Sequence, residues 1–212
     1  MNASTIAGVT YELLSEARKH WPGARNHARR WEPGRRSLYD LCAGTSHDDL
    51  DATISKLWLI GRSHSAALER THVGRQGDVY FDAASRLREA RLDETLSTLA
   101  ARPVTYDQPH RDSIALCVAN VTNILMQVTE QEKISLASKY LHYHQRSIPI
   151  YDSISDGAFR KLAQRVARGR DVYAGHLERF EDLFVALRAA NEFEPVSART
   201  IDDFVLWWWQ PD

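Results

Sequence analysis

The chain has 212 residues, and 43% of them are hydrophobic, which is enough for one globular domain with a sizeable core. A formal net charge of -1 excludes a general attraction to nucleic acid, so such binding would need a local basic patch. No apolar run approaches the roughly 20 residues that a membrane span needs, and no signal peptide opens the chain. We therefore expect a cytoplasmic protein that has no contact with membranes.

The two cysteines, Cys42 and Cys117, lie in apolar contexts and have no partner at metal-binding spacing. This pattern predicts buried free thiols in a reducing compartment. The P-loop, the dinucleotide-binding glycine motif and the zinc-protease motif are absent. No cofactor and no metal are expected, and nothing in the sequence predicts strands.

The first helix is predicted to end at Trp21-Pro22-Gly23, and a basic stretch with interleaved tryptophans spans residues 18–36. Within this stretch, Arg29, Arg30 and Trp31 suit contact with phosphates and stacking on a base. The alternative is a solvated loop or a surface for an acidic partner.

Two helices are predicted between residues 38 and 70, and Asp48 and Asp49 are expected to cap the second. That second helix contains Gly61 amid apolar residues, which often marks a kink or a close approach of backbone or ligand. The neighbouring Arg62 suits a bidentate pair with a phosphate or, alternatively, a structural salt bridge.

Further helices are expected at 79–101, 112–128, 159–168, 173–191 and 197–209. The helix at 112–128 is the most apolar and is predicted to be the central one. The loop at 103–109 divides the single helical domain, 1–212, into sub-lobes at 1–102 and 110–212. The last helix carries Trp207-Trp208-Trp209, which either pack across the domain or expose an indole to a protein partner.

The rest of the chain is organised around residues 131–156. Helical periodicity spans residues 133–144 and places Lys139 and His142 on a reactive face, away from an apolar packing face. A short extended crossing containing Pro149 and Tyr151 follows. Asp152 then takes the N-cap of the next helix, where free backbone amides keep its carboxylate ionised.

This arrangement resembles the helix-hairpin-helix (HhH-GPD) DNA glycosylase superfamily, in particular 8-oxoguanine DNA glycosylases. The matching motifs are Ser135-Leu136-Ala137, then Ile148-Pro149-Ile150-Tyr151, then Asp152. The resemblance covers about a quarter of the chain. It implies an all-α, two-lobed fold with Asp152 in the cleft between the lobes.

The chain departs from this family in two places. A glycine-rich hairpin that holds a DNA phosphate is replaced by residues 128–132, which contain two acids and no glycine. The Schiff-base lysine of the bifunctional members aligns with Ser135, as in the members that use water. Lys133 and Lys139 lie nearby as alternative nucleophiles.

The expected function is cleavage of an N-glycosidic bond in DNA, with Asp152 stabilising the sugar oxocarbenium ion. Lys139, His142 and Tyr151 would shape the pocket, while Arg62 and the basic stretch would engage phosphates. The alternatives are an N-glycosidase acting on a free nucleoside or nucleotide, and a non-catalytic helical module in which Asp152 is only a cap.

Overall fold

Helices make up most of the computed structural model, which describes residues 5–6, 9–71, 77–162, 171–189 and 196–209. The predicted all-α class is confirmed over this part of the chain. The only strands described there are β1 (Thr5–Ile6) and β2 (Val9–Thr10), a short antiparallel pair that sequence analysis did not predict. The helices are α1 (Tyr11–Gly44), α2 (Leu50–Ser63), the 3-10 turn η1 (Leu68–Thr71), α3 (Val79–Glu89), α4 (Leu92–Ala100), α5 (Gln108–Thr129), α6 (Ile134–His144), α7 (Ser153–Leu162), α8 (Val172–Ala189) and α9 (Ala198–Trp208).

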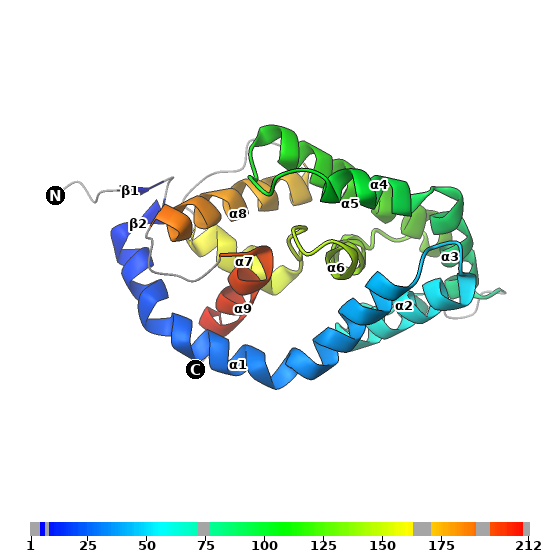
Figure 1. Ribbon diagram of the computed structural model, residues 1–212, viewed down its shortest axis with the longest axis horizontal. Coiled ribbons are helices and arrows are strands. Elements are labelled where there is room, and N and C mark those ends of the chain that lie inside the picture. Colours follow the sequence, from blue (N-terminus) through cyan, green and yellow to red (C-terminus); the bar gives the residue numbers. More distant parts are fainter. Residues whose placement is uncertain (1–4, 7–8, 72–76, 163–170, 190–195, 210–212) are drawn as a thin grey trace.

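The helices are arranged around α6. Figure 1 shows α1 and α2 along one side of the molecule, α5 and α8 along the opposite side, and α6 between them. Helix α9 packs against α1, while α7 packs against both α8 and α9. The N-terminal and C-terminal parts of the chain therefore meet where α1 crosses α9.

Helix α6, and not the segment at 112–128, is the buried central helix. Every residue from 136 to 143 is buried, because α6 contacts α1, α2 and α5. Helix α5 leaves one face in solvent, with Leu116 63% and Met126 42% exposed. The prediction failed because Lys139 and His142 made α6 look amphipathic, whereas both find polar partners inside the protein.

The expected stop at Trp21-Pro22-Gly23 was wrong, because α1 continues through Pro22 and Pro33 to Gly44. Packing against α9 overrides the local preference. A β-carbon on Gly23 would meet the Trp207 indole at 2.9 Å, so this glycine permits a close helix crossing and does not end the helix.

The helix expected at 79–101 is divided into α3 and α4 at Ala90 and Arg91. Arg91 has a left-handed backbone (φ 50°), which changes the direction of the chain. A glycine usually marks such a turn in a sequence, and here there is none. The expected cap at Asp49 is confirmed, since its carboxylate accepts from the Ala52 amide at 3.0 Å. Of the expected helix at 159–168, residues 163–168 lie outside the described residues, and α7 starts earlier, at Ser153.

Candidate functional site

Lys139 and Asp152 form the ion pair at the centre of the candidate site. Lys139 Nζ lies 3.2 Å from Asp152 Oδ2, with the lysine side chain 6% exposed and the aspartate 23% exposed. Lys139 Nζ also donates to Ser135 Oγ, one helical turn earlier, at 3.1 Å. The amine is therefore held by one oxygen from α6, that of Ser135, and one from Asp152, just before α7, while the aspartate side chain stays partly exposed.

Asp152 is held at the start of α7 by a reciprocal cap. The Ser155 amide donates to Asp152 Oδ1 at 2.8 Å, and the Asp152 amide donates to Ser155 Oγ at 3.0 Å. This confirms the predicted N-cap. Burial acts to raise the pKa of Asp152, but the Lys139 charge and the Ser155 amide outweigh it and hold the pKa below its usual value. The carboxylate is ionised at neutral pH.

A cavity of about 480 Å³ lies where α1, the end of α2, α6 and α9 meet. Neither Lys139 nor Asp152 is among the residues that line it. Apolar, aromatic and charged side chains share its lining, a mixture that is typical of sites for small organic ligands. The residues that line it are His27, Trp31, Gly34, Arg35, Leu38, Ser63, His64, Tyr143, Arg199, Asp203 and Leu206.

An arginine and aspartate network forms the floor of the cavity. Arg35 Nη1 lies 2.9 Å from Asp203 Oδ1, and Arg199 bridges Asp203 and Asp202 at 2.6 and 3.0 Å. Burial raises the pKa of Asp202 to about 7, and the Asp203 and Asp152 charges add to this, while the Arg199 charge opposes it. The network thus connects α1 to the N-terminal part of α9. The charge of Asp152 also acts on Asp202 within this network.

His64 connects the cavity to the ion pair. Its ring lines the cavity, and its Nε2 lies 2.8 Å from the Tyr143 hydroxyl. Burial lowers the pKa of His64 to about 4, and the charges of Lys139 and Asp152 both act on it. The ion pair therefore influences the protonation of a residue in the cavity lining, although it does not line the cavity itself.

Of the basic and aromatic residues predicted to contact DNA, Trp31 lines the cavity, whereas Arg29, Arg30 and Arg62 do not. Trp31 is 64% exposed at the cavity, and the neighbouring Arg29 and Arg30 are exposed on α1. Arg62 stacks over Trp58 at 5.5 Å and forms an ion pair with Glu69. This ion pair corresponds to the structural salt bridge that the sequence offered as the alternative to a phosphate contact.

His142 and Tyr151 do not line the cavity. His142 is fully buried, with Nε2 2.6 Å from the Tyr39 hydroxyl and Nδ1 2.7 Å from the Ile148 carbonyl. Both ring nitrogens are thus engaged inside the protein. Tyr151 is half-buried, and its amide donates to Ser138 Oγ at 3.0 Å, which fixes the crossing that leads to Asp152.

Five residues of the site were not predicted from the sequence: His64, Tyr143, Arg199, Asp202 and Asp203. Only weak signals marked them: a glycine three residues before His64, and adjacent acids near the start of the last helix. The three terminal tryptophans are half-buried against the core. Trp207 packs against Gly23 of α1, and Trp209 against Gly157 of α7.

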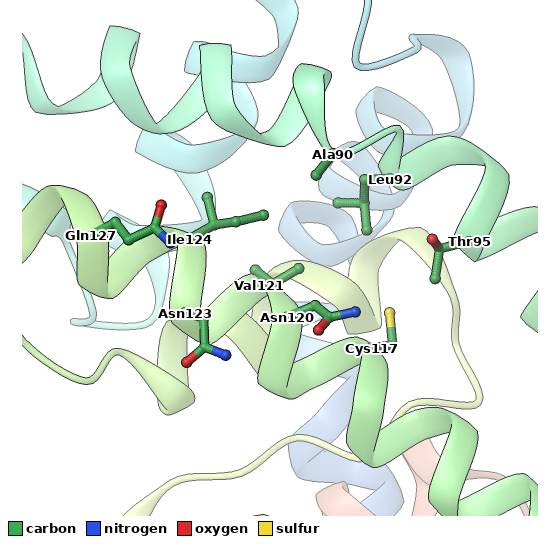
Figure 2. A pocket seen from close by; sticks show the side chains of 9 residues that line it. All are labelled: Ala90, Leu92, Thr95, Cys117, Asn120, Val121, Asn123, Ile124 and Gln127. Atoms are coloured by element: carbon green, nitrogen blue, oxygen red, sulfur yellow. The ribbon is translucent and has the colours of Figure 1, made fainter.

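A second hollow, of about 280 Å³, lies between α4 and α5 (Figure 2). Its lining is mostly apolar side chains and amides such as Asn120 and Gln127. Cys117 is its one titratable residue, and burial raises the pKa of that thiol to about 11. This hollow therefore lacks the charged groups that acid-base chemistry needs.

No protein-family model, curated protein or solved structure matches this chain. Within the described residues, no group of three or more His, Cys, Asp or Glu side chains is placed to hold a metal ion. No helix in the same part of the chain is both long and apolar enough to cross a bilayer.

Proposed function

We propose that the protein hydrolyses an N-glycosidic bond in nucleic acid, with Asp152 stabilising the positive charge that develops on the sugar. The observation that carries the proposal is the buried Lys139–Asp152 pair, whose two charges act on His64 in the lining of a cavity of about 480 Å³. A carboxylate that is ionised, fixed by an amide and partly open is the group that an oxocarbenium-like transition state requires.

Lys139 acts in this proposal as the charge partner of Asp152. Its amine is committed to Asp152 and Ser135, and Ser135 occupies the position that resembles the Schiff-base site of bifunctional DNA glycosylases. Water is then the nucleophile, and Asp152 orients it. Borohydride added during turnover should trap no covalent adduct, while an adduct would make Lys139 or Lys133 the nucleophile.

The DNA would contact the exposed face of α1. Arg29 and Arg30 supply cations for phosphates, and Trp31 offers an open indole at the cavity rim for stacking on a base. In a duplex the target nucleotide would have to leave the stack to reach Asp152.

A free nucleoside or nucleotide is the second candidate substrate, favoured by the turn between α5 and α6. Glu130, Gln131 and Glu132 are all exposed there, and Glu130 is left-handed (φ 55°). Two exposed acids repel a DNA phosphate at the place where the resembling family binds one. A small substrate needs no contact with this turn.

The test is base release by the wild-type chain from single-stranded and duplex oligonucleotides that carry a panel of modified bases, and from the matching nucleosides. Released base is separated by chromatography, and abasic sites are counted by alkaline cleavage. The variant Asp152→Asn should be inactive yet folded. Asp107→Asn, which changes another helix N-cap on α5, is the matched control and should keep full activity.

Release from oligonucleotides alone supports the DNA substrate, and release from nucleosides alone supports the second candidate. Equal activity of Asp152→Asn and wild type would overturn the proposal. Absence of release from every substrate would leave the non-catalytic helical module, for which the half-buried terminal tryptophans are the first surface to test.

A further inference from the structure

The end of α2 is built to place the His64 ring in the cavity. His64 is the C-cap residue, and its amide donates to the Ile60 carbonyl at 3.1 Å. A β-carbon on Gly61 would lie 3.1 Å from the Ala67 α-carbon, so any other residue here would push the returning backbone away by a few tenths of an ångström. Ser65 then adopts a left-handed backbone (φ 54°). The glycine prominent in the sequence thus positions His64.

The hydrogen bond between His64 Nε2 and the Tyr143 hydroxyl is compatible with a ring proton on Nδ1. A tyrosine hydroxyl carries one proton and needs an acceptor, and His64 Nε2 at 2.8 Å is the acceptor found for Tyr143 among the described residues. If Tyr143 donates to Nε2, the ring proton resides on Nδ1. Across the same part of the chain, Nδ1 has no hydrogen-bond partner, although the ring lines the cavity.

Burial, assisted by the surrounding charges, keeps the ring neutral at physiological pH. Burial is the main cause that lowers the pKa of His64, and the cations facing it from three helices lower it further: Lys139 of α6, Arg199 of α9 and Arg35 of α1. Asp152 acts in the opposite sense and does not outweigh them. A neutral ring with a free N–H is a directional hydrogen-bond donor that adds no charge to the cavity.

We propose that His64 is a substrate-binding residue that donates a hydrogen bond from Nδ1 to an acceptor atom, a ring nitrogen or a carbonyl oxygen, of the nucleobase held in the cavity. This inference rests on the proposed glycosidic cleavage and adds to it the residue that selects the base. Tyr143 is a positioning residue, because it acts by fixing the tautomer of His64.

The inference is tested with His64→Phe, His64→Asn and Tyr143→Phe in the base-release assay. Phenylalanine removes the donor, so kcat/KM should fall about 10- to 100-fold. Asparagine keeps an N–H close to the position of Nδ1 and should restore activity to within a few-fold of wild type. Tyr143→Phe frees the tautomer and should cost less than His64→Phe. Circular dichroism confirms that each variant is folded.

A second experiment uses a series of substrates in which single acceptor atoms of the base are replaced by C–H. The relative rates within this series would not change if His64 had only a structural role. Wild type should discriminate against one member of the series, and His64→Phe should process that member and its parent base at similar rates. Undiminished discrimination by His64→Phe would overturn the inference. If Asp152→Asn is inactive in the same assay, the proposed function survives that result; if wild type itself releases no base, both fail.

Discussion

Replacing Lys139 by methionine isolates the electrostatic role of the lysine, because methionine keeps an unbranched apolar stem of similar length. The change leaves the Asp152 carboxylate largely buried and without its cation. Removing one partner of a buried pair typically costs about 3–5 kcal/mol. Here Asp152 retains the Ser155 amide and is 23% exposed, so we expect a smaller loss of about 2 kcal/mol in the free energy of unfolding.

The assay is urea denaturation at pH 7, followed by tryptophan fluorescence, in a double-mutant cycle with Asp152→Asn. The double variant should be more stable than Lys139→Met alone, because asparagine leaves no unpaired charge. The coupling energy should be about 1–2 kcal/mol. Lys56→Met is the matched control, because Lys56 is also buried but donates to the Thr45 carbonyl at 2.7 Å. Additive effects for Lys139→Met and Asp152→Asn would refute the electrostatic argument.

Stability should fall as pH drops from about 6 to 4.5. Burial lowers the pKa values of three histidines far below the unfolded value of 6.5, to about 4 for His64, about 3 for His142 and about 2 for His144. Each histidine therefore takes up a proton only on unfolding, whereas Asp202, with a pKa of about 7, releases one. These four groups alone take up about two protons net, a loss on the order of 2–3 kcal/mol per pH unit, measurable as a shift of the urea midpoint. His47 and His110, whose pKa values burial also lowers, act in the same direction. Gly61→Ala should destabilise the fold by about 1–3 kcal/mol, because its β-carbon would meet a backbone atom at 3.1 Å, and thermal unfolding measures this. Arg29→Glu/Arg30→Glu should abolish salt-sensitive DNA binding in a gel shift at low salt, because two phosphate contacts become repulsive.

Each of these three predictions has a result that would contradict it, and two of them have a matched control variant. A urea midpoint that is constant or rises between pH 6 and 4.5 would contradict the histidine argument. Gly44→Ala has open space around its β-carbon and should not destabilise, so equal losses for both glycines would speak against the close approach. Arg88→Glu on α3 changes an exposed arginine away from the cavity lining. Equal loss of binding in that variant would indicate a general charge effect.

The segment around Asp152 could be predicted from the sequence because its signals are local. The cap at Asp152, the helix before it and the extended crossing all depend on neighbours within a few residues. The same holds for the cap at Asp49. Capping and proline geometry act over one turn, so they need no knowledge of the fold.

The cavity could not be predicted because its residues come from distant helices. Arg35 and Asp203 pair across 168 positions of sequence, and nothing local in either helix indicates the other. Helix α1 passes through two prolines because of its crossing with α9, which local propensity cannot report. His64 was hidden for the same reason, since its role depends on Tyr143, 79 residues away.

The most direct test of the account measures binding and turnover of one substrate by wild type and by Asp152→Asn under the same conditions. The account predicts that the variant binds the substrate within a few-fold of wild type but releases no base, because the carboxylate acts on the transition state and contributes little to ground-state affinity. Base release by Asp152→Asn at a rate comparable to wild type would contradict the claim that this carboxylate is the reactive group.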